Sequence, residues 1–280
     1  MELKYRIVNV FAREGRLTGN PLCVFEDGSS LDDATMQALA LQFNLSETTF
    51  ILPSTKASAR VRIFTPAYEM PFAGHPTLGT AHVVRSLKGE GVSVTLEMKA
   101  GVIPVSAKGD LWTLQAVAPR SRAMELTRGE LEEILGLRPG DVAEWPLWVN
   151  AGKEQLVVPL SSVEAVRRAS PRPDAFSRLK SEDGQSMALV FHDAGDAAGK
   201  VEARFFFPKG PAILEDPATG SACANLGGWF TVVRPQTDIV REVSQGEMVG
   251  RPSTLYLDVT AGAIHVGGRV VELGRGSLTP

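Results

Sequence analysis

Apolar and polar residues alternate along many short segments of the chain, which is the pattern of half-buried β-strands. The predicted strands cover residues 5–11, 22–25, 48–52, 60–64, 92–96, 102–105, 112–117, 145–149, 155–159, 187–191, 201–207, 254–259, 263–266 and 270–273. The segment Pro119-Arg120-Ser121-Arg122 interrupts this pattern, so we expect a domain boundary there, with domains at 1–118 and 119–280. A return of the last strand to the first domain stays open.

Helical spacing predicts helices between these strands. Ser30 or Asp32 is the expected N-cap of the first helix, whose apolar residues run from Met36 to Phe43. Shorter helices are predicted near 127–135 and 163–168, and a polar segment at 174–185. Residues 77–87 and 220–230 are mostly small and apolar, which predicts two buried helices, each opening on a glycine.

The two halves of the chain resemble each other around these buried helices. Arg62-Ile63-Phe64-Thr65-Pro66 has a counterpart in Arg204-Phe205-Phe206-Phe207-Pro208, at an offset of 142 positions. Each segment leads through a short loop into a glycine and a buried helix. Strand-loop-helix units also match by chance, so the spacing is compatible with internal duplication without requiring it. If the duplication is real, the default ligand site is a cleft between two similar α+β domains.

Composition narrows the class of protein. The 280 residues are 44% hydrophobic and carry a formal net charge of -3, without a long run of like charges. This argues against nucleic acid or an anionic membrane as the partner. The N-terminal residues lack the apolar core of a secretion signal, so we expect a cytoplasmic protein in which Cys23 and Cys223 are reduced thiols.

Three places in the sequence could carry chemistry. Glu47 lies at a helix-to-strand junction beside apolar residues, where a desolvated carboxyl group can act as a general acid or base. Gly74-His75 and Gly220-Ser221 each open a buried helix, whose first N–H groups suit a carboxylate or another anion. Asp216 adds a carboxylate shortly before the second of these helices. A surface role for Glu47 and a structural hydrogen bond for His75 remain the simpler alternatives.

Other chemistries lack their sequence patterns. No metal-ligand spacing is present, and neither the phosphate-loop nor the dinucleotide-binding glycine pattern occurs. Ser221 is not in the Gly-x-Ser-x-Gly context of a hydrolase nucleophile. We therefore expect neither a metal nor a cofactor.

Six motifs, in this order along nearly the whole chain, together resemble the PhzF family of phenazine-biosynthesis proteins. They are Gly19-Asn20-Pro21, residues 44–48 (NLSET), residues 62–66 (RIFTP), residues 71–77 (PFAGHPT), residues 216–222 (DPATGSA) and residues 245–253 (QGEMVGRPS). The resemblance implies the α+β, diaminopimelate-epimerase-like fold. In that fold two similar domains, each a β-sheet or barrel wrapped around a central helix, enclose the active site in the cleft between them.

The resemblance also implies residue roles. Glu47 matches the family's proton-transferring glutamate, and His75, Asp216 and Ser221 match its other active-site residues, while Asn20, Gly74 and Gly220 are expected to bind substrate. The implied activity is a cofactor-independent proton shift on a small carboxylate-bearing substrate such as trans-2,3-dihydro-3-hydroxyanthranilate, carried out by a homodimer.

Two alternatives stay open. An amino-acid or hydroxy-acid epimerase would invert one stereocentre, and a non-catalytic protein would bind a small ligand without turnover. The related epimerases use two cysteines, one at each helix start, where this chain has His75 and Ser221. That difference favours a single carboxylate as the proton carrier.

Overall fold

Strands predominate in the computed structural model, which describes residues 2–89 and 94–280. The chain divides into two units, one made of Met1–Gln115 with Gly267–Pro280 and the other of Ala116–Val266. The long last strand, β17 (Ala263–Leu278), therefore begins in the second unit and ends in the first.

The first unit is a sheet that closes on itself. Its elements are β1 (Leu3–Val10), β2 (Asn20–Phe25), α1 (Asp33–Phe43), β3 (Thr48–Leu52), β4 (Ala59–Phe64), β5 (Glu69–Met70), α2 (Gly74–Lys88), β6 (Val94–Met98), β7 (Gly101–Lys108), β8 (Leu111–Gln115) and the end of β17. Strands β1 to β4 pair in chain order, with β2 and β3 parallel, and β4 continues in parallel to β6. β6, β7 and β8 follow as antiparallel neighbours, and β17 pairs with both β8 and β1, which closes the ring.

The second unit repeats this pairing order. Its elements are β9 (Arg120–Ala123), α3 (Arg128–Leu135), β10 (Leu147–Asn150), β11 (Glu154–Pro159), α4 (Val163–Arg168), α5 (Pro173–Phe176), β12 (Ala188–Asp193), β13 (Lys200–Lys209), β14 (Ala212–Asp216), α6 (Gly220–Val233), β15 (Ile239–Gln245), a 3-10 turn at Glu247–Val249 and β16 (Ser253–Thr260). β11 and β12 are parallel like β2 and β3, and β13 and β15 are parallel like β4 and β6. The short hairpin β13–β14 corresponds to β4–β5. The internal similarity seen in the sequence is thus a repeated strand topology.

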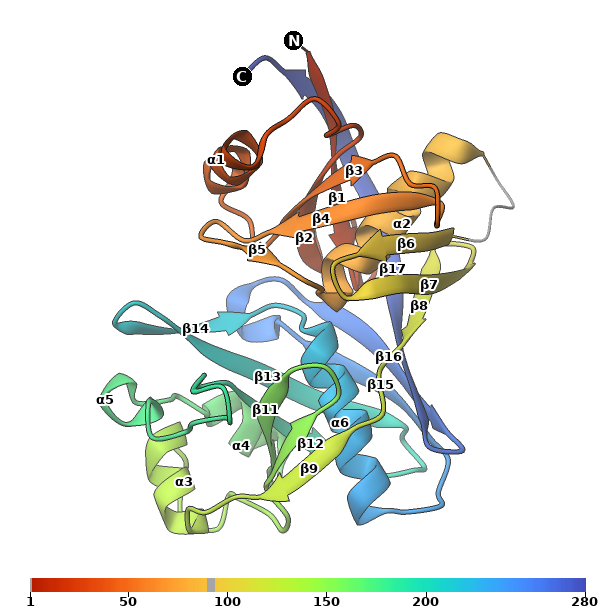
Figure 1. Cartoon of the computed structure of the whole chain (residues 1–280). Coiled ribbons are helices and arrows are strands. Elements are labelled where there is room, and N and C mark those ends of the chain that lie inside the picture. Colours follow the sequence, from red (N-terminus) through yellow and green to blue (C-terminus); the bar gives the residue numbers. More distant parts are fainter. Residues whose placement is uncertain (1, 90–93) are drawn as a thin grey trace. The chain divides into compact units, whose positions relative to one another are not determined.

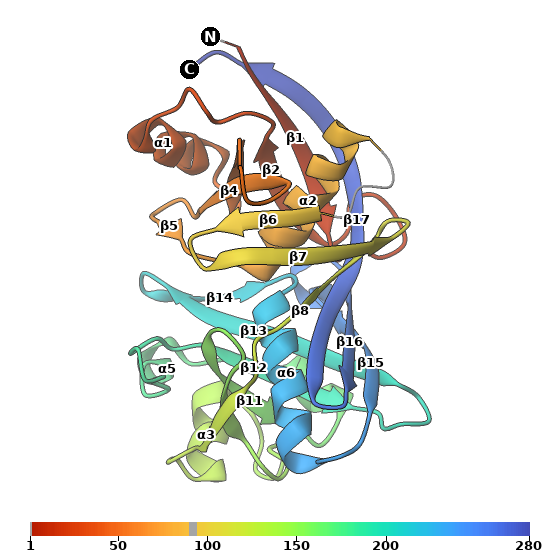
Figure 2. The same cartoon turned by 45° about the vertical axis from the view of Figure 1, so that its right-hand side comes forward.

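One helix is buried in each unit. α2 packs against β1, β2, β3, β4, β6 and β8 and crosses the first unit inside these strands (Figure 1). α6, the helix labelled in Figure 2, packs against β9, β10, β11, β15 and β16 of the second unit. Small residues permit this contact: a Cβ on Gly79 would lie 2.5 Å from Leu22 Cδ2, and one on Gly227 would lie 2.7 Å from Ile264 Cγ2. No helix in the described parts of the chain is long and apolar enough to cross a membrane.

The predicted helix starts are confirmed, whereas several strands differ from the prediction. Asp32 caps α1 by accepting from the Thr35 N–H, and Asn44 ends the helix in the left-handed conformation. The predicted strands 263–266 and 270–273 are wrong as separate elements because they form one continuous strand, β17. The expected break at 119–122 contains β9, whose polar residues pair with β10.

Other elements were missed in the sequence. β5, β14, β15 and the short helix α5, which lies in the predicted polar segment, have weak or mixed patterns. β10 begins two residues later than predicted, after Trp145 with its positive φ of 68°. The first two residues of the predicted strand 92–96 lie outside the described residues.

Candidate active site

Glu47, His75 and Asn20 meet in the first unit. Glu47 lies in the turn between α1 and β3, and His75 is the second residue of α2. Glu47 Oε2 is 2.9 Å from His75 Nδ1, and the opposite ring nitrogen, Nε2, is 3.2 Å from the main-chain oxygen of Asn20. The His75 side chain is 6% exposed and that of Glu47 18%, so the carboxylate has limited access to solvent.

The Asn20 carbonyl is held in place by a turn that requires glycine. Gly19 has φ +79°, and a Cβ at this position would lie 2.5 Å from the Val10 oxygen. Asn20 then begins β2 opposite Val10 of β1. The conformational freedom of Gly19 thus allows the carbonyl that follows it to contact the imidazole.

This carbonyl determines how protons are placed on His75. A carbonyl oxygen only accepts hydrogen bonds, so Nε2 must carry a hydrogen. In the neutral ring Nδ1 then accepts, and Glu47 must be protonated to donate to it; in the imidazolium Nδ1–H donates to the Glu47 carboxylate. Either way, one proton lies between Glu47 Oε2 and His75 Nδ1. Within the described chain Glu47 Oε1 has no hydrogen bond, so this is the oxygen that can reach a ligand.

Both buried helices begin without a capping side chain. The residues before α2 and α6, Ala73 and Thr219, make no side-chain hydrogen bond to the first turn. A helix start leaves several N–H groups without partners in the helix, and the helix dipole makes this end partly positive. Gly74 and Gly220, each the first residue of its helix, bring the backbone within reach of a ligand. Each start is therefore suited to an anionic oxygen.

Asp216 lies in a polar cluster just before α6. It ends β14, and its Oδ2 accepts a 2.5 Å hydrogen bond from the Thr219 hydroxyl. Gln245, at the end of β15, donates to the Asp216 main-chain oxygen at 2.8 Å and accepts from the Thr219 N–H at 3.3 Å. Gln245 is buried and thereby links the loop of Asp216 to the neighbouring strand.

Ser221, the second residue of α6, contacts a different set of residues. Gln155 Nε2 of β11 donates to its hydroxyl oxygen at 2.9 Å. Asn225, one helical turn further along α6, donates to Gln155 Oε1 at 2.8 Å. The start of α6 is thus tied to β11 by two buried amide side chains.

The structure places the predicted site residues in two groups. Asn20, Glu47, Gly74 and His75 belong to the first unit, and Asp216, Gly220 and Ser221 to the second. Sequence reasoning missed Gln155, Asn225, Thr219 and Gln245 as contributors. Their signals were present: Gln155 is a polar residue in an apolar strand, and Asn225 lies four positions after Ser221, on the same face of the helix.

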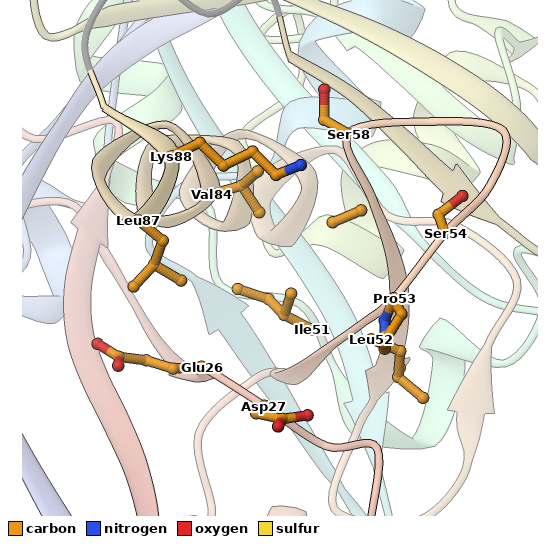
Figure 3. A pocket seen from close by; sticks show the side chains of 11 residues that line it. Glu26, Asp27, Ile51, Leu52, Pro53, Ser54, Ser58, Val84, Leu87 and Lys88 are labelled. Atoms are coloured by element: carbon orange, nitrogen blue, oxygen red, sulfur yellow. The ribbon is translucent and has the colours of Figure 1, made fainter.

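A hollow in the first unit lies away from the predicted residues. It has a volume of about 430 Å³, and Ile51, Leu52, Pro53, Val84 and Leu87 are among its apolar lining residues (Figure 3). Lys88, the last residue of α2, also lines it, whereas His75 is at the first turn of the same helix. The hollow therefore lies near the C-terminal end of α2, whereas the Glu47–His75 pair lies at its N-terminal end.

Neither cysteine is placed to act as an acid or base. Cys23 lies within β2 and Cys223 in the first turn of α6, and both thiols are buried. Burial raises the pKa of each thiol far above its usual range. In the described part of the chain, no group of three or more His, Cys, Asp or Glu side chains is arranged to hold a metal ion.

Solved structures place this fold in a known class. A phenazine biosynthesis protein of the PhzF family from Bacillus anthracis matches with a TM-score of 0.87 and 23% identity over 100% of both chains. A hydroxyproline epimerase from Agrobacterium vitis matches with a TM-score of 0.63 and 12% identity over 99% of this chain and 92% of its own. The chain thus has the α+β, diaminopimelate-epimerase-like fold that the resemblance implied.

Sequence relatives narrow the class to a family. The model of the PhzC-PhzF family, described as phenazine biosynthesis-like protein, matches residues 8–276. An uncharacterized isomerase of Pasteurella multocida is 37% identical over 98% of this chain and 93% of its own. Trans-2,3-dihydro-3-hydroxyanthranilate isomerase of Pseudomonas fluorescens is 32% identical over 98% of both. The chain belongs to the PhzC-PhzF family, and it is an isomerase.

Proposed function

We propose that this isomerase catalyses a cofactor-independent proton shift on a small cyclic carboxylate, with trans-2,3-dihydro-3-hydroxyanthranilate as the first substrate to test, and that Glu47 carries the proton. The observation that carries the proposal is the 2.9 Å contact between Glu47 and His75 at the start of α2. The Pseudomonas fluorescens relative, named for this substrate, supports the choice of molecule.

The single proton between Glu47 and His75 supports the proposed role of Glu47 as a proton carrier. With His75 as the imidazolium, Glu47 is a carboxylate whose Oε1 can take a proton from a substrate carbon. The C–H electron pair then moves into the conjugated system of the substrate. The same oxygen returns the proton to another carbon, so no oxidant or external base is consumed. His75 stays charged throughout and stabilises the carboxylate whenever it forms.

The second group of residues has a binding role in this proposal. The N–H groups at the start of α6, from Gly220 onward, and the Ser221 hydroxyl would hold the substrate carboxylate. Asp216 would accept a hydrogen bond from the substrate's amino or hydroxyl group. Asn20 and Gly74 would border the substrate in the first unit.

The decisive experiment is an incubation with trans-2,3-dihydro-3-hydroxyanthranilate in D₂O, with deuterium uptake and product followed by mass spectrometry. Glu47→Gln should lower turnover by about 10⁴-fold or more while binding and folding persist, since a sole proton carrier lies at the upper end of general acid–base effects. Glu133→Gln removes an exposed carboxylate on α3 and should leave turnover unchanged. A Glu47→Gln enzyme with wild-type turnover would refute the role of Glu47.

The same experiment separates the alternative chemistry when it is run on amino acids and hydroxy acids. Uptake of deuterium at an α-carbon with inversion would make the enzyme an epimerase. The burial of Cys23 and Cys223 and the presence of His75 and Ser221 at the helix starts disfavour the two-thiol form of that reaction.

We also propose that the enzyme is cytoplasmic, that its small net charge leaves it without a nucleic acid partner, and, from the family resemblance, that it is a homodimer. Light scattering coupled to size-exclusion chromatography tests the dimer. A mass of 30.0 kDa in solution, that of a single chain, would contradict it.

A further inference from the structure

Ser221 is held by a chain of side-chain amides that starts at the backbone. Ala151 N–H donates to Asn225 Oδ1 at 2.7 Å, and Asn225 Nδ2 donates to the Lys153 main-chain oxygen at 2.8 Å. Both backbone groups lie in the turn between β10 and β11. Because an N–H can only donate and a carbonyl can only accept, these two contacts fix independently which atom of the Asn225 amide is oxygen.

The direction of the remaining hydrogen bonds follows from that assignment. The second hydrogen on Asn225 Nδ2 is donated to Gln155 Oε1 at 2.8 Å. Gln155 therefore presents Nε2 to Ser221, and at 2.9 Å it donates to the hydroxyl oxygen. Ser221 accepts this bond, so its own hydrogen remains available to donate. Within the described residues no acceptor takes that hydrogen.

The burial of the two amide side chains makes the direction of these hydrogen bonds hard to reverse. Asn225 is 0% exposed and Gln155 2%, so water cannot replace the partners that an inverted amide would lose. Ser221 itself is only partly buried and lies in the first turn of α6, which has no capping side chain. Its hydroxyl thus offers a donor at the same end of the helix as the first N–H groups, which have no partners within the helix.

We propose that Gln155 and Asn225 are positioning residues that fix the Ser221 hydroxyl as a hydrogen-bond donor, so that the start of α6 selects a carboxylate over a neutral amide of the same shape. The proposal rests on the proposed function only in identifying this carboxylate with that of the substrate. A group that offers donors alone at this place, such as a protonated amine or the NH₂ of a carboxamide, would face the Ser221 hydrogen unfavourably.

The test compares the binding of anthranilate with that of 2-aminobenzamide by calorimetry. The wild-type enzyme should bind anthranilate more tightly. Ser221→Ala should weaken anthranilate binding by about tenfold or more, since a hydrogen bond to a charged oxygen is lost. Gln155→Met should weaken it by about threefold to tenfold, because the hydroxyl is no longer held in the donor orientation. Gln185→Met, at an exposed glutamine of the same unit, should change neither ligand.

A double-mutant cycle distinguishes positioning from general support of the fold. In the Ser221→Ala background, Gln155→Met should cause no further loss, because the group that it positions is already absent. Equal losses in both backgrounds, wild-type affinity in Gln155→Met, or equal binding of the two ligands by the wild type would each overturn the proposal. Turnover adds a second readout: Gln155→Met should raise KM and leave kcat nearly unchanged.

A second variant serves if Gln155→Met fails to fold. The carboxylate of Gln155→Glu still accepts from Asn225 and also accepts the Ser221 hydrogen, which turns the hydroxyl inward. Gln155→Glu should therefore bind 2-aminobenzamide more tightly than anthranilate. This preference should shrink when Ser221→Ala is added to Gln155→Glu, because only the added negative charge then disfavours anthranilate. An unchanged preference for anthranilate would overturn the proposal. If the binding pattern is as expected but the enzyme does not isomerise the substrate, the proposed function is rejected and this inference stands.

Discussion

Arg62 and Arg204 make equivalent contacts in the two units. The Arg62 guanidinium lies over the Phe64 ring at 5.0 Å and pairs with Glu69 of β5 at 2.8 Å. The Arg204 guanidinium lies over the Phe206 ring at 4.8 Å and pairs with Glu215 of β14 at 2.7 Å. Each arginine thus fastens the short hairpin that precedes a buried helix, which explains why this stretch of sequence is repeated.

The Arg62–Glu69 pair predicts an acid-sensitive contribution to stability. The hydrogen bonds from Arg62 lower the pKa of Glu69 from its usual value near 4.5 to about 2. Because the folded-state pKa is the lower one, the contribution is complete above about pH 5 and is lost as the pH falls towards 2. Glu69→Gln should lower the free energy of unfolding at pH 7 by at most about 3 kcal/mol, a difference that shrinks in acid.

Urea unfolding at several pH values measures this effect, and Asp33→Asn is the matched control. Asp33 binds the same arginine, but its side chain is 83% exposed, against 14% for Glu69. Solvent screens an exposed pair, so the control should change stability little. Equal losses in the two variants would show that burial does not determine the strength of these pairs.

The buried thiols lead to a second prediction at this scale. Since burial raises the pKa of Cys23 and Cys223, neither should be present as the reactive thiolate in the folded protein. A disulfide reagent such as dithionitrobenzoate should label neither residue until the protein is unfolded, and it should leave turnover intact. Rapid labelling of the native enzyme with loss of activity would point to a thiol mechanism.

At the scale of elements, the position of each buried helix is set by the strands around it. α2 approaches β1 and β2 at Gly79, where an added Cβ would meet Leu22, Val10 and Val8 at 2.5, 2.9 and 3.2 Å. The start of α2 carries His75, so a displaced helix would also move the imidazole away from Glu47 and Asn20.

Gly79→Ala is therefore expected to lower both stability and activity. Overpacking typically costs about 1–3 kcal/mol, more than the gain in helix propensity from alanine. Gly129→Ala in α3 is the control, because a Cβ there would meet no atom within 4 Å and the backbone is helical. It should leave thermal unfolding unchanged or raise its midpoint slightly. If Gly79→Ala matched this control, the close contact of α2 with β1 and β2 would not be required.

At the scale of the whole molecule, the two units differ in how the chain builds them. The second is one continuous segment, Ala116–Val266, whereas the first needs Gly267–Pro280 as well. In that return the end of β17 pairs with β1 from Leu278 opposite Leu3 to Val270 opposite Val10. It also brings Glu272 to the buried guanidinium of Arg6, at 3.0 Å.

This difference predicts the behaviour of fragments. Residues 2–115 alone should fail to fold, because β1 and β8 lose β17, the strand that closes the sheet, and Arg6 loses Glu272. A fragment in which residues 267–280 are joined by a short linker to residue 2 should fold, since these chain ends lie side by side (Figure 1). Circular dichroism and amide exchange would measure both fragments. A cooperative unfolding transition in 2–115 alone would show that the returning strand is dispensable.

The sequence alone determined the family, the two buried helices and the residues at their starts. These features depend on local signals: an Asp cap, glycines before small and apolar runs, and motifs of a few consecutive residues. The repeat of Arg62–Pro66 at Arg204–Pro208 also indicated the doubled topology that the strand pairing shows.

Only the tertiary structure decided which distant residues meet. The sequence left open whether the last strand returns to the first unit, and it predicted two strands where residues 263–278 form one, because strand partners far apart in sequence decide where a strand ends. Which nitrogen of His75 carries a hydrogen depends on a carbonyl 55 positions away. Whether the Ser221 hydroxyl accepts a hydrogen bond depends on Gln155, 66 positions away. Hydrogen-bond direction is set by the partner atom, and the partner is known only once the chain is folded.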